Sequence, residues 1–426
     1  MATPFWYNAA LAIVKPLYRW KIKKRAQSAE AYQQECLERF GPFQAVKNTQ
    51  TIWFHVVSVG ETNAAQPLIE HYLQLGHPVL VTNTTKTGQA RAKSLFLKAP
   101  HENLFQAVYL PADQKSLVAQ FFEKYQPKML VLVETELWPN LIAQAKKLNI
   151  PAILVNARLS EKSANGYAKV KSLTQPMLHG LTQLLAQDQA SLQRFQALGM
   201  PTELSQVVGS IKFDIHAPQS FVDQAEQLKD EWSLHHRKVI TLASTHAPEE
   251  QKLIKALSEH LIEDPELLII VVPRHPERFA EVYQVTQDLN LNTKRRSLGQ
   301  LITSDTQVYL ADSMGEMWLW YALSNACFVG GSLNEPGGGH NILEPISLNV
   351  PTVIGPNYFN FQTIVNEFVE AYAVAVGDDA EQVASMLLDF AENESLAKQM
   401  AMNAQVIMQK NAGSLAKHIQ VLDQYL

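Results

Sequence analysis

The feature that most constrains the fold of this chain is an alternation of short apolar runs with longer helical patterns. It begins near residue 50 and restarts near residue 239. This alternation is typical of parallel sheets covered by helices on both faces, so we predict an α/β chain with two doubly wound domains. The predicted strands are 52–59, 79–82, 107–110, 129–133, 153–156, 183–186 and 206–208, then 239–243, 267–272, 307–310, 326–329 and 352–354.

The length of 426 residues and an apolar content of 46% suffice for two hydrophobic cores. We place the first domain at residues 26–212, a linker at 213–236 and the second domain at 237–426, whose last helix could cross back onto the first domain. The net charge of −5 gives no general argument for nucleic-acid binding. Cys36 and Cys327 match no metal or disulfide spacing.

Residues 1–25 combine an apolar, aromatic stretch with a basic end. Lys and Arg residues follow this stretch between positions 15 and 25, and no acid precedes Glu30. A cleaved signal peptide has the opposite order, and a spanning helix needs roughly 20 uninterrupted apolar residues. We therefore expect a membrane-interfacial anchor; an ordinary docking helix and a short signal-anchor helix are the alternatives.

Loops rich in glycine, arginine and histidine follow the strands of the second domain. Ligands of doubly wound sheets bind beyond the carboxyl ends of the strands. Arginine pairs with phosphate oxygens, and glycine-rich turns leave backbone amides free to bind phosphate. The candidate ligand-binding residues are Arg274, His275, Pro276, Met314, Gly315, Gly330, Gly331, Ser332, Asn341 and Glu344. A solvated basic turn and a plain helix cap are the alternatives for the loops at Arg274 and Met314.

Carboxylates follow the strands of the first domain instead. Glu61 stands directly after a glycine turn, where a helix N-terminus should favour its ionised form and lower its pKa. Such a carboxylate can take the proton of an attacking hydroxyl as a general base; a first-turn cap is the alternative. Glu134 and Glu136 would share one face of an extended segment, and nothing near them completes a set of metal ligands.

Six motifs are spread over nearly the whole chain: His55-x-x-Ser58-x-Gly60-Glu61, Glu134-Thr135-Glu136-Leu137-Trp138-Pro139-Asn140, Asn156-Ala157-Arg158-Leu159-Ser160, Pro273-Arg274-His275-Pro276-Glu277-Arg278, Asp312-Ser313-Met314-Gly315-Glu316 and Gly339-His340-Asn341-Ile342-Leu343-Glu344-Pro345. Together they resemble the 3-deoxy-D-manno-octulosonic acid (Kdo) transferases of Gram-negative lipopolysaccharide assembly. Arg39-Phe40-Gly41 also fits this family.

This resemblance implies a GT-B type glycosyltransferase with two Rossmann-like domains facing a cleft. Such an enzyme moves Kdo, with inversion, from CMP-Kdo to the lipid A precursor lipid IVA at the cytoplasmic face of the inner membrane. Residues 26–212 would bind the acceptor and residues 237–426 the CMP-sugar donor. Glu61 looks like the catalytic base. The second-domain loops resemble the CMP-binding set, and the acceptor candidates are Ser58, Lys86, Glu134, Glu136 and Arg158.

The resemblance also implies which partners to expect. They are CMP-Kdo, the lipid A precursor and the inner-membrane surface, with no nucleic acid, metal or other cofactor. Two rival functions share the same scaffold. One is a sugar-nucleotide epimerase, and the other is a membrane-tethered nucleotide-binding module without catalysis.

Overall fold

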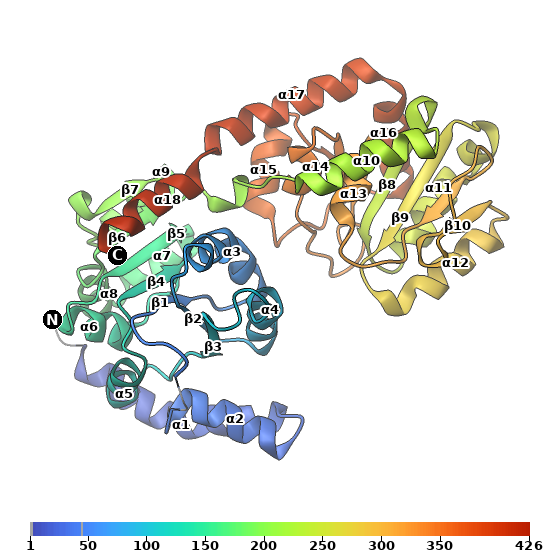
Figure 1. The fold of residues 1–426 in the computed structure, drawn as a ribbon. Coiled ribbons are helices and arrows are strands. Elements are labelled where there is room, and N and C mark those ends of the chain that lie inside the picture. Colours follow the sequence, from blue (N-terminus) through green and yellow to red (C-terminus); the bar gives the residue numbers. More distant parts are fainter. Residues whose placement is uncertain (1–2, 44–45) are drawn as a thin grey trace. The chain divides into compact units, whose positions relative to one another are not determined.

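The computed structural model describes residues 3–43 and 46–426. The chain divides into one unit of Met1–Asp214 with Ala412–Leu426 and a second unit of Ile215–Asn411. Over the described residues, each unit contains a seven-stranded sheet in which all paired strands are parallel (Figure 1). The predicted α/β class with two doubly wound domains is therefore confirmed.

The first sheet has the strand order β3-β2-β1-β4-β5-β6-β7. Trp53 and Leu130 face one hydrophobic core, whereas Phe54 and Val131 face another on the opposite side. Because both faces are buried, the strands read as continuous apolar runs. The strands are β1 Ile52–His55, β2 Val79–Asn83, β3 Phe105–Tyr109, β4 Met129–Val133, β5 Ala152–Ala157, β6 Gln183–Ala186 and β7 Ser205–Val207.

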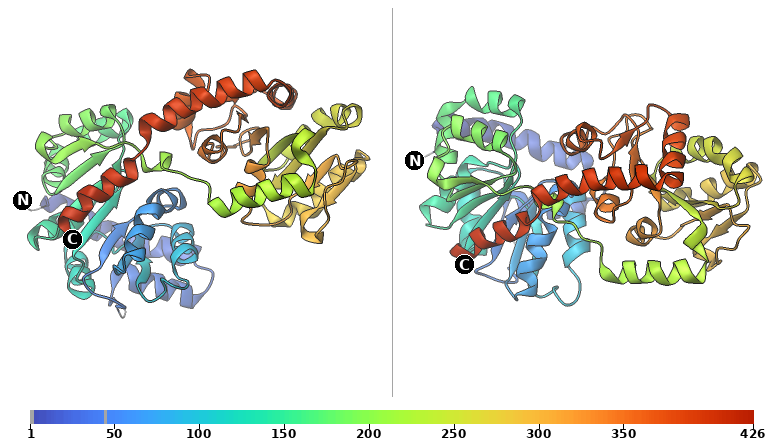
Figure 2. Two further views of the ribbon diagram at one scale, coloured as in Figure 1. Left: turned by 45° about the horizontal axis from the view of Figure 1, so that its top comes forward. Right: turned by 90° about the horizontal axis from the view of Figure 1, so that it is seen from above.

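Helices cover both faces of the first sheet, and the last of them comes from the C-terminus. Val421 and Leu422 of α18 belong to the same core as Phe54 (Figure 2). The end of the chain thus folds with the first unit. The helices are α3 Val59–Gln74, α4 Lys86–Phe96, α5 Lys115–Tyr125, α6 Pro139–Lys147, α7 Glu161–Ala168, α8 Lys171–Leu178, α9 Gln189–Ala197 and α18 Ser414–Leu422.

The second sheet repeats this plan with the order β10-β11-β9-β8-β12-β13-β14. The edge strands β10 and β14 of this sheet were not predicted from the sequence. Each is only two or three residues long and neither is fully buried, so neither gives a clear apolar run. The strands are β8 Lys238–Thr245, β9 Leu267–Pro273, β10 Thr293–Arg295, β11 Val308–Leu310, β12 Ala326–Val329, β13 Thr352–Ile354 and β14 Ala375–Val376.

The helices of the second unit include one in the segment that we set apart as a linker. Ala225 and Leu228 of α10, with Trp232 just after it, are buried in a core of the second sheet. Residues 215–236 therefore belong to the second unit. The helices are α10 Gln219–Glu231, α11 Glu249–Glu263, α12 Phe279–Asp288, α13 Met317–Ala322, α14 Leu343–Ser347, α15 Gln362–Glu370, α16 Ala380–Glu392 and α17 Glu394–Asn411.

Two N-terminal helices precede the first sheet. Helix α1, Phe5–Arg25, lies beside α2, Ala29–Phe40, and the two meet through Ile22, Tyr18 and Phe40 (Figure 1). Within residues 3–43 and 46–426, no helix is both long and apolar enough to cross a membrane.

The order of the strands determines where the loops with the candidate site residues lie. Strand β1 pairs with both β2 and β4, so the chain reverses its winding direction between β1 and β4. Strand β8 pairs with β9 and β12 in the same way. Ligands of such sheets bind beyond the carboxyl ends of the strands at this switch point. Glu61 follows β1 and Glu134 follows β4, while Gly330 follows β12, so the fold brings the predicted residues to these positions.

The start of α4 packs so closely on the end of β1 that only glycine fits at position 88. A Cβ atom there would lie 2.8 Å from Thr85 Oγ1 and 2.9 Å from the carbonyl oxygen of Val57. We expect Gly88→Ala to destabilise the protein by about 1–3 kcal/mol because this backbone contact cannot relax cheaply.

Gly166→Ala is the matched control, since Gly166 lies in α7 with open space around it. It should stabilise the protein by about 0.5–1 kcal/mol through the lower backbone entropy of the unfolded chain. Denaturant unfolding measures both free energies. Equal effects of the two substitutions would contradict the packing argument.

Candidate functional site

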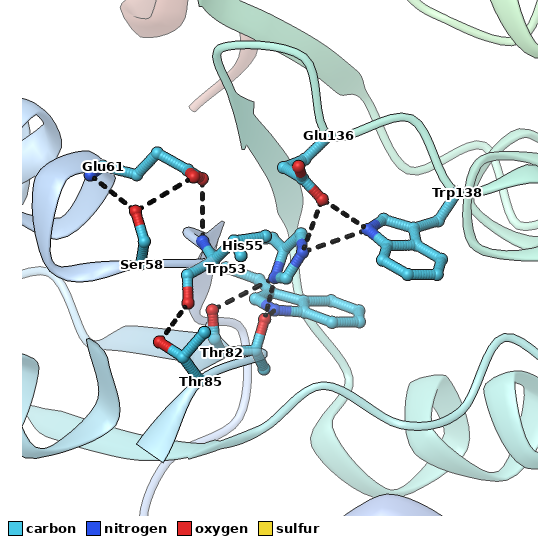
Figure 3. Close-up of polar contacts among 9 residues, drawn as sticks. Trp53, His55, Ser58, Glu61, Thr82, Thr85, Glu136 and Trp138 are labelled. Atoms are coloured by element: carbon cyan, nitrogen blue, oxygen red, sulfur yellow. Dashed lines mark hydrogen bonds and ion pairs between the residues drawn. The ribbon is translucent and has the colours of Figure 1, made fainter. Parts of the chain in front are cut away.

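Glu61 lies in the first turn of α3 and is held by its own helix start. The amide of Val57 donates to Glu61 Oε2 at 2.7 Å, and the Ser58 hydroxyl donates to Oε1 at 3.2 Å (Figure 3). Ser58 is also the N-cap, because its hydroxyl oxygen accepts from the Glu61 amide at 3.4 Å. The arrangement resembles a capping box, so the capping role that we raised as an alternative is real. The side chain of Glu61 nevertheless remains partly exposed.

Two further carboxylates, Glu134 and Glu136, lie in the loop after β4. Glu136 Oε2 accepts from Trp138 Nε1 at 3.2 Å and lies 3.9 Å from His55 Nε2. Figure 3 shows Glu61 and Glu136 at the same edge of the sheet. The structure therefore brings four of the predicted site residues of the first domain together, namely Ser58, Glu61, Glu134 and Glu136.

The pKa of Glu61 is raised to about 7, the opposite of what we predicted. Burial is the main cause, and the negative charges of Glu136 and Glu134 add to it. The hydrogen bonds from Val57 and Ser58 act in the other direction but are outweighed. Burial also raises the pKa of Glu136, with the Glu134 charge contributing. A helix N-terminus stabilises the ionised form of a carboxylate by only about 0.3–1 kcal/mol. Burying that ionised form beside other negative charges costs more, so the pKa rises.

Beneath these acids lies a neutral histidine. His55 is fully buried, and burial lowers its pKa to about 4, with the positive charge of Arg39 contributing. Trp138 Nε1 donates to His55 Nε2 at 3.1 Å, so the ring proton is on Nδ1, which donates to the Thr82 carbonyl at 3.1 Å. Trp53 Nε1 donates to the Thr82 hydroxyl at 2.8 Å. This network fixes Trp138 and hence the loop that carries Glu136 (Figure 3).

Lys212 is a site residue that the sequence reasoning missed. Its Nζ donates to Glu134 Oε1 at 2.8 Å, which places a cation among the carboxylates. The sequence signal that could have identified it was its position in the loop that follows the last strand of the first sheet, in the short 3₁₀ helix Ile211–Phe213. Glu134 itself has a φ of 61°, a backbone conformation uncommon outside glycine. Strained residues of this kind concentrate at functional sites.

The other acceptor candidates lie around this edge. Lys86 is exposed at the start of α4, where its Nζ donates to Gln27 Oε1 at 2.8 Å. Arg158 follows β5, is half-buried, and its amide donates to the carbonyl of Glu134. The binding roles of both residues stay predictions.

In the second unit the glycine-rich loop after β12 is built around a buried acid that the sequence reasoning also missed. Glu249, at the start of α11, accepts from the amides of Gly331, Ser332, Leu333 and His246 at 2.8–2.9 Å. These amides are therefore not free for a phosphate, contrary to our prediction for Gly331 and Ser332. The amide of Gly330 is also occupied, because it donates to the carbonyl of Ala243.

Three histidines gather beside that loop. The Nε2 atoms of His246 and His340 lie 2.8 Å apart, and the ring centroids of His246 and His275 lie 5.0 Å apart. Burial lowers the pKa of His340 to about 4 and also lowers that of His246, with nearby cationic groups contributing. The short contact is therefore a hydrogen bond between two neutral rings. Arg274 is exposed next to His275 and is a charge available to an anion.

The remaining donor candidates lie in two loops. Asn341 Nδ2 donates to Glu344 Oε1 at 3.3 Å, and burial raises the pKa of Glu344. Met314 is 60% exposed and precedes Gly315, whose φ is 89°. Two ion pairs hold this second loop, Arg295 with Asp312 and Arg296 with Glu316. Pro276 begins a short 3₁₀ turn and is exposed.

No group of three His, Cys, Asp or Glu side chains suited to a metal ion occurs in the part of the chain that the structure describes.

Comparison with known proteins identifies related sequences. A family described as 3-deoxy-D-manno-octulosonic-acid transferase (kdotransferase) matches residues 34–215. The 3-deoxy-D-manno-octulosonic acid transferase of Haemophilus influenzae is 35% identical, over 99% of this chain and 98% of that protein.

Two solved structures are also similar. The C-terminal CMP-Kdo binding domain of WaaA from Acinetobacter baumannii is 58% identical, with a TM-score of 0.45, over 45% of this chain and all of that one. A glycosyltransferase from Rickettsia africae is 15% identical, with a TM-score of 0.53, over 89% of this chain and 99% of that one. The second likeness shows a shared fold alone.

Glu249→Gln tests the architecture of the loop after β12. The substitution places an amide NH₂ group against backbone donors, so at least one buried donor loses its acceptor. We expect a loss of about 2–4 kcal/mol in the free energy of unfolding and faster hydrogen exchange at Gly331 and Ser332. Glu259→Gln, on the exposed face of α11, is the control. Unchanged exchange in Glu249→Gln would contradict the assignment.

Proposed function

Because this chain belongs to the 3-deoxy-D-manno-octulosonic acid (Kdo) transferase family, we propose that Glu61 is the general base with which it transfers Kdo from CMP-Kdo to lipid IVA. The protein is a glycosyltransferase of lipopolysaccharide biosynthesis that takes a sugar-nucleotide donor. Neither rival function, an epimerase or a nucleotide-binding module without catalysis, is favoured by this family membership.

The single observation that carries the proposal for Glu61 is its setting. It is a partly exposed carboxyl group beyond the end of β1, with a pKa of about 7 set mainly by burial. A general base is most effective when its pKa lies near the working pH, because it is then both sufficiently ionised and sufficiently basic. A pure cap needs only the ionised form. The raised pKa therefore favours the catalytic role over the capping role alone.

The proposed step is an inverting displacement. A hydroxyl oxygen of lipid IVA forms a bond to the anomeric carbon of Kdo while the bond from that carbon to the phosphate oxygen of CMP breaks. The hydroxyl proton passes to the Glu61 carboxylate, and the bonding electron pair leaves with CMP. The anomeric carbon is fully substituted, so the transition state is cation-like, and the negative field of Glu134 and Glu136 suits positive charge developing near them.

The second unit supplies groups for the donor in this proposal. CMP-Kdo is the ligand for which the WaaA domain, 58% identical in sequence, is named. Arg274 and His275 are exposed beside the loop after β12 and suit the phosphate, and Asn341 with Glu344 suits a ribose. A single phosphodiester is a leaving group that such side chains can stabilise without a metal ion.

We propose further that α1 attaches the enzyme to the cytoplasmic face of the inner membrane. Trp6, Ile13, Leu17 and Trp20 are spaced by seven, four and three residues, which places them on one face of the helix. Ile13, Leu17 and Trp20 are 71%, 63% and 63% exposed. Lys23, Lys24 and Arg25 form the last turn, where they suit anionic lipid headgroups.

The base assignment predicts that Glu61→Gln lowers transfer ~100-fold or more, while CMP binding and thermal stability stay near those of the wild type. Glutamine still accepts the Val57 amide but cannot take a proton at neutral pH. The mass of the lipid product measures transfer. Glu70→Gln, farther along α3, is the matched control and should retain activity.

The pH dependence of the wild-type enzyme is part of the same test. Glu61 must be ionised to act as a base, so the rate should fall tenfold per unit as pH drops below about 7. Near-normal transfer by Glu61→Gln, or a rate independent of pH between 5 and 7, would refute the assignment.

The membrane proposal predicts that changing Ile13, Leu17 and Trp20 together to serine weakens binding to vesicles containing phosphatidylglycerol at least tenfold. Each side chain contributes about 1.5–3 kcal/mol when it is buried in an apolar environment. Met402→Ser with Val406→Ser is the control, since these residues are equally exposed on α17 of the second unit. Equal sedimentation of the two variants with vesicles would count against α1 as the anchor.

A further inference from the structure

Helix α2 buries three charged side chains, although nothing in the proposed chemistry uses them. Glu35, Glu38 and Arg39 are 8%, 6% and 1% exposed. Burying charge is costly unless each group is paired and hydrogen-bonded, so the contacts that these residues make are worth following. Arg39, from the Arg39-Phe40-Gly41 segment, bonds to the backbone of the loop after β2.

Arg39 joins α2 to the loop after β2. Its Nε donates to Glu35 Oε1 at 2.8 Å, and its Nη2 donates to the carbonyl oxygen of Thr84 at 2.6 Å. The guanidinium also stacks over the ring of Tyr109, 4.2 Å from its centroid. Glu35 in turn pairs with Arg25, the last residue of α1. The α1–α2 pair is thus tied through Arg39 to the backbone at Thr84.

From Thr84 the hydrogen bonds continue to the proposed base. The next residue, Thr85, donates to the carbonyl of Val57 through its amide at 3.1 Å and through its hydroxyl at 2.9 Å. The amide of the same Val57 donates to Glu61 Oε2 at 2.7 Å (Figure 3). The backbone of Val57 is therefore held at its carbonyl by Thr85, and its amide orients Glu61.

The opposite end of α1 is tied to the loop that carries the other carboxylates. Tyr7 donates its hydroxyl to the buried Asp113 at 2.8 Å. Asp113 accepts the amides of Asn140 and Leu141 at 3.0 and 2.9 Å and so fixes the start of α6, directly after Trp138. The C-terminal end of α1 thus reaches the Thr84–Thr85 loop through Glu35 and Arg39, and its N-terminal end reaches the segment that follows Glu134 and Glu136.

We propose that Arg39 is a positioning residue for Glu61, and that the α1–α2 pair is a structural support of the active site as well as a membrane anchor. The inference rests on the proposed role of Glu61. A helix pair that served only as a tether would need no buried arginine bonded to the backbone of the Thr84–Thr85 loop. Loss of the Arg39 contact frees the Thr84–Thr85 loop and, through Val57, the carboxylate.

The direction of the effect on pH dependence follows from the groups around Glu61. Glu134 and Glu136 in the loop after β4 oppose its ionisation. The amide of Val57 and the hydroxyl of Ser58 favour it. His55 on β1 is neutral, and Lys212 is already paired with Glu134. Weakening the Val57 hydrogen bond therefore raises the pKa of Glu61.

The test is Arg39→Lys in the full-length enzyme, assayed with detergent-dispersed lipid IVA so that membrane attachment does not limit the rate. Lysine keeps the charge but cannot bond Glu35 and Thr84 together in the geometry of a guanidinium. We expect kcat to fall ~10-fold or more, KM to stay within about twofold, and the acidic limb of the kcat profile to move to higher pH.

Arg237→Lys is the matched control, since Arg237 also donates to backbone carbonyls, those of Leu267 and Thr306. Arg237 lies at the amino ends of the strands of the second sheet, directly before β8. Arg237→Lys should leave kcat and the pH profile unchanged, whatever it does to thermal stability. Wild-type kcat, or a lowered kcat with an unshifted acidic limb, in Arg39→Lys would overturn the proposal.

Thr85→Val and Thr85→Ser test the next bond in the path if Arg39→Lys folds poorly. Valine removes the hydroxyl that donates to Val57, so it should shift the acidic limb in the same direction, whereas serine should restore the wild-type profile. An unshifted limb in Thr85→Val would overturn the inference. Glu61→Gln distinguishes a failure of the Arg39 inference from a failure of the proposed function. A Glu61→Gln enzyme that still transfers Kdo refutes the base assignment itself.

Discussion

Parallel pairing of the strands is the constraint on which everything else in this protein depends. It brings the carboxyl ends of all strands in a unit to one edge, and the reversal of winding at β1/β4 and at β8/β12 opens that edge to side chains from neighbouring loops. Residues as distant in sequence as Glu61, Glu136 and Lys212 become neighbours for this reason.

The two units place carboxylates differently at the carboxyl ends of their strands. In the first, the carboxylates themselves are presented, and their mutual repulsion and burial raise the pKa of Glu61 and Glu136. In the second unit, the buried Glu249 accepts hydrogen bonds from four backbone amides and so fixes the glycine-rich loop that lies beside Arg274 and the three histidines. A glycine-rich loop after a strand is therefore not by itself a phosphate cradle, because an internal carboxylate can occupy its amides first.

The N-terminal helices make specific contacts with the loops of the first sheet, in addition to the membrane attachment that we propose for α1. The membrane attachment proposed for α1 needs only an apolar face and a basic end. Tyr7, Asp113 and Arg39 add specific, mostly buried contacts that a tether does not require. These contacts give a physical reason for the Arg39-Phe40-Gly41 segment, which the proposed catalytic chemistry leaves unexplained.

The sequence by itself determined the fold class, the main strands, the family and the loops on which Glu61, Glu136 and the second-unit candidates stand, because apolar periodicity and motif spacing are local properties. It missed the strands β10 and β14, which are short and lie at the edges of the second sheet. Only the tertiary structure decided the sign of the Glu61 pKa shift, since burial and the charges of Glu134 and Glu136 arise from contacts across the sheet. The same holds for the long-range contacts of Glu249 and Lys212, which span 78–84 positions, and for that of Arg39 with Thr84, which spans 45. No local pattern encodes such pairings; they exist because parallel strands bring distant loops to one edge.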